Sequence, residues 1–574
     1  MSQGSEMLYQ SALARVPWAR RMSDADLLTV TEELHHRLLT DEDRGAVLAD
    51  VFAVGLESVG RGLGEPISET VPALAAILWH GGVVRRGVEV EDRDANGAMA
   101  VALYAHAVSG GAEGGVHLIL GSETEAGWAA NYLAVVLRPL GVEVGHLSEL
   151  ATAQDRRRGF GAAVVCGSYG AFCLDFLKTE QVGGPSDHSP RARRFAIVSD
   201  ANEILIGKSD AEVALLHRDE EVDERRFQAM AEFAAALSRS EHFYVSPIAG
   251  LDRSDVILTA VGKQRLAEHW SIGDESDPKA VVLESDLIEA LRAKYCYTEG
   301  ADYSVVDGKV VLQEGVGIQA DHAFTGGRRQ AIEAAKTLAI TPLEVPLATI
   351  DVPAYLRLYN SLSGLAAGQP APASVFDELY GLAVIGDEPR SDLSEREKTY
   401  LRVDRWRRAV SGFRQEIDAL RAATLATPQF LPMMRSMVEA AVRTEAAAAE
   451  NNIRVLIPAM SRLYPIHLGV ADFETGVDAI VPDAMGAFDR RAQAVGEDML
   501  DTAARIIARR FIDELWSAYL TLQNAIFNAC WAADDCNEYR NRTAEQFRRT
   551  MEQIRRETTR HLFRVDVASV LASE

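Results

Sequence analysis

Three short apolar runs constrain the fold of this chain more than any other feature of its sequence. They occupy residues 116–120, 163–165 and 195–198, and helical stretches alternate with them between about Val71 and Gly207. Such alternation is typical of a parallel sheet, because consecutive parallel strands are joined by crossover connections that usually contain a helix. We therefore predict an α/β domain with a parallel sheet in the first part of the chain.

Beyond Ser394 the chain is predicted to be helical. Ser394 and Glu397 have the spacing of a capping box, which satisfies free N–H groups at the start of a helix. After them strand signals almost disappear, and residues such as Met499 and Ala503 show apolar positions returning at helical spacing. The last third of the chain is therefore expected to form an all-α domain. Within it, we interpret Trp516 as a core residue rather than an exposed interaction site.

A hairpin predicts a small α+β domain between these two regions. Residues 303–306 and 309–312 read as short strands, and Asp307-Gly308 separates them. Asp-Gly is favoured in two-residue hairpin turns because both turn positions need positive φ. Residues 220–340 contain both helix and strand signals, which agrees with a domain of this kind.

The composition disfavours several partners and sites. The formal net charge of −25 repels phosphate backbones, so no nucleic-acid partner is expected. No uncharged apolar run reaches the roughly 18 residues of a membrane-spanning helix, and no secretory signal is readable, which predicts a cytoplasmic protein without an integral membrane segment. The cysteines are odd in number and scattered, so we predict neither a disulfide framework nor a metal site. They are Cys166, Cys173, Cys296, Cys530 and Cys536.

Several blocks of the sequence resemble the SecA family, whose members push unfolded secretory proteins through a membrane channel. The block from Phe195 to Ile206 is similar to the segment that carries the family's acidic metal-binding box, and the block from Ile512 to Trp516 is similar to its helical scaffold. Other similar blocks occupy residues 115–119, 140–145, 172–177, 307–311, 327–334, 340–342, 347–350, 355–359 and 554–567. The blocks follow the family's order, and the resemblance covers roughly residues 20–390 and 495–567.

The resemblance implies a particular architecture. It comprises a degenerate RecA-like, P-loop-type sheet domain with an inserted α+β preprotein-binding domain, followed by an all-α helical scaffold. The family's second RecA-like domain is expected to be missing, because helical patterns occupy residues 390–495, where the family has strands. The expected divisions are 1–218 for the sheet domain, 219–340 for the inserted domain, 341–393 for a return segment and linker, and 394–574 for the scaffold.

The segment that corresponds to the family's phosphate-binding loop lacks the chemistry of such a loop. A P-loop needs glycines that let N–H groups cradle phosphates, a lysine for the β/γ charge and a hydroxyl for magnesium. The first lysine of the whole chain is Lys178, downstream of this segment, and the acidic Asp92 and Asp94 would repel a triphosphate. We therefore expect the segment not to bind ATP tightly. This degenerate loop comprises Asp94, Ala95, Asn96 and Gly97.

Other family positions also depart from the pattern. The acidic box would read Ser199-Asp200-Ala201-Asn202, so Asp200 is its only remnant, and a solvent-facing residue at a strand end is the alternative interpretation of Asp200. Leu78 stands near the family's adenine-reading glutamine, and residues 366–368 replace a threonine-rich coupling motif. The triplet from Gly207 to Ser209 superficially resembles the end of a P-loop but follows the wrong strand. No catalytic residue is assigned, and no cofactor is expected.

These inferences lead to a predicted function with two alternatives. We predict a SecA-like component of protein translocation that binds a preprotein or a translocation partner without hydrolysing ATP, a pseudo-ATPase. An accessory SecA-type ATP-dependent translocase with a divergent site would instead bind Mg-ATP. A cargo-handling or structural protein repurposed from SecA is the other alternative. The implied partners are signal-bearing cargo, an active SecA or the membrane channel, and the implied location is the cytoplasm, peripheral to the inner face of the plasma membrane.

Overall fold

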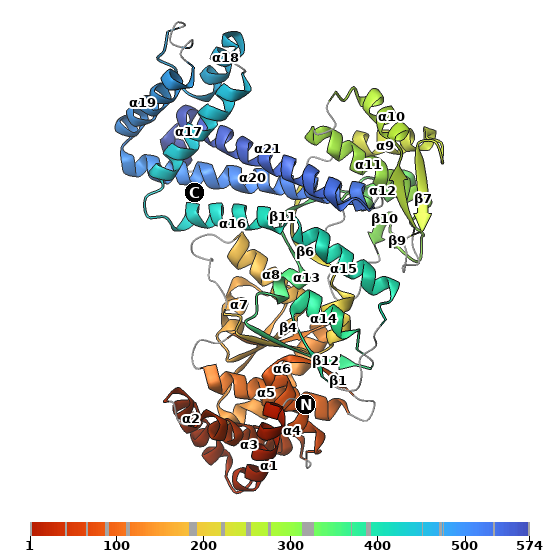
Figure 1. Ribbon diagram of the computed structural model, residues 1–574, viewed down its shortest axis with the longest axis vertical. Helices are drawn as coiled ribbons and strands as arrows, with labels where there is room; N and C mark the ends of the chain where they lie inside the picture. Colours follow the sequence, from red (N-terminus) through yellow and green to blue (C-terminus); the bar gives the residue numbers. More distant parts are fainter. Residues whose placement is uncertain are drawn as a thin grey trace.

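The computed structural model shows a sheet domain in the middle of the molecule, helices below it, and an inserted unit and a helical region above it (Figure 1). The N-terminal helices lie beneath the sheet, and the long helices near the C-terminus run across the top towards the inserted unit. The structure describes residues 3–40, 43–64, 67–86, 91–110, 115–182, 192–219, 224–247, 254–273, 277–312, 326–368, 370–385, 392–449, 452–469, 473, 476–531 and 534–571.

The sheet has seven strands, and every pair of neighbours is parallel. Their order is β13-β1-β12-β5-β2-β4-β3, which places the late strand β12 between the early strands β1 and β5. The three predicted apolar runs coincide with β2, β4 and β5, so the predicted parallel sheet is confirmed. The strands are β1 Gly82–Arg86, β2 Val116–Leu120, β3 Val144–Leu147, β4 Val164–Ser168, β5 Phe195–Val198, β12 Ser361–Ala367 and β13 Val384–Ile385.

Both faces of the sheet are covered by helices. On β5, Phe195 and Ile197 belong to an apolar cluster with the N-terminal helices, whereas Ala196 and Val198 belong to a cluster on the opposite face. This alternation explains why the strands read as continuous apolar runs, because a parallel strand is buried on both sides. The covering helices include α1 Gln3–Ala19, α2 Asp24–Leu39, α3 Arg44–Leu63, α4 Thr70–His80, α5 Asp92–Gly110, α6 Glu123–Leu137, α7 Ala153–Phe160, α8 Tyr169–Phe176, α13 Val352–Leu356 and α14 Ala373–Tyr380.

A two-stranded antiparallel ribbon carries the inserted unit. Strand β6 (Glu212–Asp219) leaves the sheet domain, and β11 (Leu343–Asp351) returns to it, with Asp219 opposite Leu343. The predicted hairpin is confirmed, since Asp307 and Gly308 both have positive φ, at 51° and 75°. The unit contains α9 Glu224–Ala236, β7 Phe243–Pro247, β8 Ser254–Leu258, α10 Ala260–Trp270, α11 Pro278–Tyr295, β9 Tyr303–Val306, β10 Lys309–Leu312 and α12 Arg328–Ala335.

The described residues beyond Ser394 are helical, as predicted, and Ser394 with Glu397 forms the expected capping box. Among the described residues, each sheet other than the seven-stranded one has two antiparallel strands. The described residues therefore form no second parallel sheet. The divisions expected at residues 218, 340 and 393 stay a prediction. The helices are α15 Glu395–Arg408, α16 Ser411–Ala426, α17 Leu431–Ala448, α18 Ile453–Leu463, α19 Val477–Val495, α20 Glu497–Trp531, α21 Cys536–Arg564 and α22 Val567–Leu571.

Candidate functional site

The carboxyl ends of β1, β12 and β5 lie at one edge of the sheet, because these strands are parallel neighbours. Open α/β sheets bind ligands at this edge. A cavity of about 380 Å³ opens there, between the chain that follows β5, the chain that follows β12 and the start of α15. Its lining includes Asp200, Asn202, Glu203, Gly207, Ala367, Ser394, Arg396 and Tyr400.

Asp200 lies at this edge and caps a turn. Its Oδ1 accepts a hydrogen bond from the backbone N–H of Glu203 at 3.1 Å. This bond stabilises the start of the π-helical segment η4 (Asn202–Gly207). The observed contact is therefore structural, and a catalytic role of Asp200 stays untested.

Asn202 ties together the ends of two strands, a role that the sequence did not reveal. Its side-chain N–H donates to the carbonyl of Ala367 at 3.1 Å, and its side-chain oxygen accepts from the N–H of Ala371 at 3.1 Å. An amide can do both because it has a donor and an acceptor. Asn202, which the family resemblance assigned to the acidic box, thus connects the chain after β5 to the end of β12.

The segment expected to form the degenerate loop lies at the start of a helix, and the expectation that it does not bind ATP tightly stays a prediction. Asp94, Ala95, Asn96 and Gly97 lie in the first two turns of α5. Of residues 87–91, which separate β1 from α5, the first four are outside the described residues. The helix begins with Asp92 and Asp94, acidic residues of the kind that favour a helix N-terminus. The connecting residues Gly87-Val-Glu-Val90 contain no lysine.

Asp94 is buried and anchors two helices to each other. Asp94 is 6% exposed. Its Oδ2 accepts hydrogen bonds from the hydroxyls of Ser68 at 2.6 Å and Thr70 at 3.5 Å. The guanidinium of Arg93 lies 3.8 Å from Oδ1. Burial raises the pKa of the neighbouring Tyr132 phenol to about 12. The start of α5 therefore presents a buried carboxylate to the start of α4.

The remaining family positions have structural roles. Leu78 is buried, and its carbonyl accepts a hydrogen bond from Ser363 at 2.6 Å. In the triplet from Gly207 to Ser209, Lys208 pairs with Glu203 at 3.1 Å, and Ser209 donates to the carbonyl of Ile206 at 2.7 Å. These side chains are bound within the protein, so the triplet is not arranged as a phosphate loop.

A second cavity, of about 500 Å³, lies where the ribbon meets the scaffold. Arg407 pairs there with Asp351 at 2.8 Å, and Arg414 donates to the Thr349 hydroxyl at 2.7 Å. Burial raises the pKa of the Asp418 carboxyl, against the opposing effect of Arg414. Amide side chains that can donate and accept also line this junction cavity. They are Gln181, Gln415, Gln523, Asn524 and Asn528.

The described residues contain neither a cluster of metal ligands nor a membrane-spanning helix. In the ranges that the structure describes, no three His, Cys, Asp or Glu side chains gather in a way that could hold a metal ion. Among those same residues, no helix is both long and apolar enough to span a bilayer. The expected absence of a cofactor stays a prediction.

The parallel sheet, the insertion on its ribbon and the helices that follow define a RecA-like domain with an inserted unit and a helical scaffold. Two family models match the chain, the SecA DEAD-like domain over residues 4–374 and the SecA Wing and Scaffold domain over residues 403–566. The chain therefore belongs to the SecA family.

Curated relatives agree with this assignment. The chain is 26% identical over 367 residues to the protein translocase subunit SecA of Acidothermus cellulolyticus, which is 64% of this chain and 36% of the relative. For the subunit of Micrococcus luteus the identity is 27% over 376 residues, 65% of this chain and 40% of the relative. For that of Solidesulfovibrio magneticus it is 28% over 385 residues, 67% and 44%. The matched part thus spans less than half the length of these relatives.

The two matched regions leave only residues 375–402 between them. Domains have at least about 50 residues, so this interval is too short for a second RecA-like domain. The described part of the interval contains the end of α14, strand β13 of the first sheet and the start of α15. The expected helices between residues 390 and 495 are thus confirmed for the described residues of that range.

Proposed function

We propose that this chain is a SecA-family component of protein translocation that binds a preprotein or a translocation partner and does not itself hydrolyse ATP. The buried Asp94 at the start of α5 is the observation that carries the second half of this proposal. A helix that follows the first strand of a RecA-like sheet binds phosphate through its free N–H groups, and a carboxylate there opposes an anion. No lysine precedes Lys178, so the segment also lacks the lysine that neutralises the β/γ charge in a P-loop.

Neither the remnant of the acidic box nor the coupling position supports hydrolysis. Asp200 already accepts a hydrogen bond from the backbone of Glu203, and Ala366 and Ala367 have no hydroxyl. The residues at this edge therefore do not fit a magnesium-bound triphosphate, and we derive no step through one.

The junction cavity supports the binding of a polypeptide. Asn524 and Asn528 are one helical turn apart on α20, and both line the cavity. Within the described ranges, neither side chain makes a hydrogen bond to another residue. Their amides can therefore pair with the main-chain N–H and C=O groups of an extended segment, which every unfolded protein has whatever its sequence.

Nucleotide binding is tested by thermal unfolding with Mg-ATP and with Mg-ADP. We expect no shift of the unfolding midpoint at millimolar nucleotide, since a ligand at about 100 times its Kd would stabilise the folded state by about 2.7 kcal/mol. Magnesium chloride alone is the control. A saturable shift, together with phosphate release that disappears in Asp200→Ala, would instead establish the alternative of an accessory ATPase.

Polypeptide binding is tested with a fluorescent, reduced and carboxymethylated protein that stays unfolded. We expect the double variant Asn524→Leu, Asn528→Leu to bind this probe about tenfold more weakly, because two hydrogen bonds of about 0.5–1.5 kcal/mol each are lost. Fluorescence anisotropy measures the Kd. The matched control is Asn131→Leu on the exposed face of α6, which should bind like the unmodified chain. No binding by the unmodified chain would contradict the proposal and favour a structural protein.

A further inference from the structure

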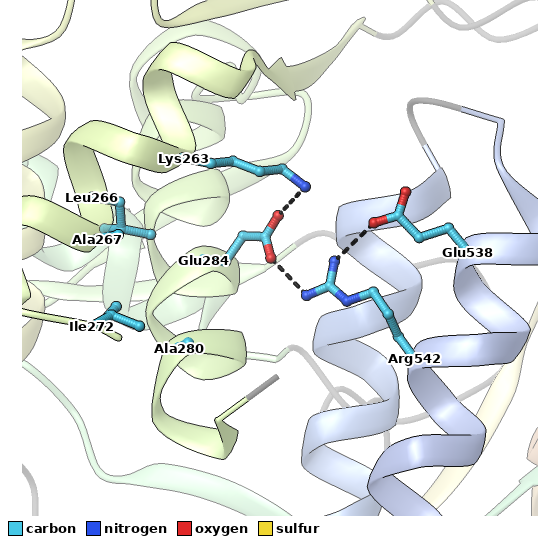
Figure 2. A pocket seen from close by; sticks show the side chains of 8 residues that line it. All are labelled: Lys263, Leu266, Ala267, Ile272, Ala280, Glu284, Glu538 and Arg542. Carbon is cyan, nitrogen blue, oxygen red and sulfur yellow. Dashed lines mark hydrogen bonds and ion pairs between the residues drawn. The ribbon is translucent and has the colours of Figure 1, made fainter. Parts of the chain in front are cut away.

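A chain of charged side chains joins the inserted unit to the scaffold. Figure 2 shows Glu284 of α11 between Lys263 of α10 and Arg542 of α21. The carboxylate of Glu284 lies 2.9 Å from the Lys263 ammonium and 2.7 Å from the Arg542 guanidinium. Arg542 also lies 3.5 Å from Glu538, one turn away on its own helix. Glu284 and Arg542 are 258 positions apart, so no local pattern could have predicted the contact.

Glu284 is desolvated, so its charge depends on these partners. The residue is only 8% exposed. Burial acts to raise the pKa of its carboxyl, but Arg542 and Lys263 outweigh burial, and the pKa is lowered from its ordinary value. The carboxylate is therefore ionised at neutral pH and attracts the scaffold cation strongly, since charge-assisted hydrogen bonds are about twice as strong as neutral ones.

Each half of this bridge has a second counter-charge on its own side. If the inserted unit moved away from α21, Glu284 would keep Lys263, and Arg542 would keep Glu538. Breaking a buried ion pair is usually costly because it leaves a charge unpaired. Here neither charge would be left unpaired, so the contact can open at a lower cost than an ordinary buried pair.

Apolar surface lies directly beside the bridge. A cavity of about 270 Å³ is lined on one side by the four charged residues and on the other by Leu266, Ala267, Ile272 and Ala280 (Figure 2). Next to it, Val281 of α11 packs in one cluster with Cys530 of α20. Separation of the two units would expose this cluster.

We propose that Lys263, Glu284, Arg542 and Glu538 form a reversible latch that holds the inserted unit against the scaffold. When the latch opens, it uncovers the apolar cluster that contains Val281 and Cys530. The inference does not depend on whether the chain binds polypeptides. The closed state is favoured by the Glu284–Arg542 contact, and the open state is favoured by the two pairs that remain on either side.

Cys530 reports the opening without any label. It is 2% exposed, beside the latch, and a buried thiol reacts slowly because the thiolate is the reactive form. The experiment measures the rate at which N-ethylmaleimide modifies Cys530 in the full chain, resolved from the other cysteines by peptide mass mapping. Cys166, buried in the sheet, serves as the internal reference for global unfolding.

The latch makes predictions of opposite sign for its members. Arg542→Met removes the closing contact, so Cys530 should be modified about tenfold faster. Lys263→Met and Glu538→Gln remove the pairs that sustain the open state, so both should slow the modification below that of the unmodified chain. Arg548→Met is the matched control, because Arg548 is on the same helix and, among the described residues, its ion pairs are with Glu545 and Glu552 of that helix.

Two results would overturn the proposal. If all three latch variants accelerate modification of Cys530, the four charged residues only stabilise the closed contact and do not form a reversible latch. If Arg542→Met leaves the rate unchanged while Cys166 stays unreactive, the ion pair does not hold the units together.

Discussion

Replacing Arg292 by methionine should lower the free energy of unfolding of the inserted unit by about 3–5 kcal/mol. Arg292 is 9% exposed and donates to Asp255 at 2.7 Å and to Glu289 at 2.5 Å. The phenol of Tyr297 donates to Glu289 at 2.8 Å. Without the guanidinium, the buried carboxylates of Asp255 and Glu289 would lose the cation that lies between them. Leaving buried charges uncompensated is among the most destabilising effects of a single substitution.

Hydrogen exchange of peptides from α9 to α12 measures this effect, since protected amides report the free energy of opening of their own region. Arg265→Met is the matched control, because Arg265 lies in the same unit but is exposed. Its ion pair with Glu268, at 3.8 Å, is also exposed. This substitution should change the free energy of opening by no more than about 0.5 kcal/mol. Equal effects of the two substitutions would mean that the buried network contributes no more than a surface ion pair.

Replacing Trp516 by alanine should destabilise the scaffold by about 3–5 kcal/mol. Trp516 is 2% exposed in the core of the helical region, and its ring stacks on Tyr519 with centroids 4.8 Å apart. Alanine would leave a cavity that the long helix α20 cannot close, because its neighbours are fixed by packing on several sides. The burial confirms the interpretation of Trp516 as a core residue.

Hydrogen exchange of peptides from α17 to α21 measures the effect, because protected amides report the free energy of opening of their own region. Trp128→Ala on α6 is the control, since Trp128 is 75% exposed and its removal should change the free energy by no more than about 0.5 kcal/mol. A Trp516→Ala variant as stable as Trp128→Ala would show that the scaffold repacks freely around residue 516.

The parts of the fold that the sequence predicted are those with a local signal. The strands β2, β4 and β5 are continuous apolar runs, Asp307-Gly308 needs only its own two φ angles, and Ser394 with Glu397 is complete within four residues. Helix α1 was not predicted, since it has a proline at Pro17 and no capping signature. For the elements that were predicted, the decisive information lies within a few positions of the chain.

The parts of the site that the sequence did not predict depend on distant partners. The sequence placed Asp94 in a degenerate loop that should not bind ATP tightly, but it could not show that Ser68 and Thr70 donate to the Asp94 carboxylate. Asn202 reads as a lost acid, and only the return of β12 beside β5 reveals that it joins the two strand ends. Side-chain contacts of this kind form only after the chain has crossed the sheet, so no spacing rule can predict them.

The ribbon that carries the inserted unit has a consequence for that unit's unfolded state. Because Asp219 and Leu343 stay opposite each other in the ribbon, an unfolded insert would remain a closed loop anchored at both ends. A closed loop has less conformational entropy than a free chain of the same length, which raises the free energy of the unfolded state. The sheet domain thus acts on the insert as an intramolecular cross-link would, so that part of the insert's stability is provided by the topology of its host and by no side chain of its own.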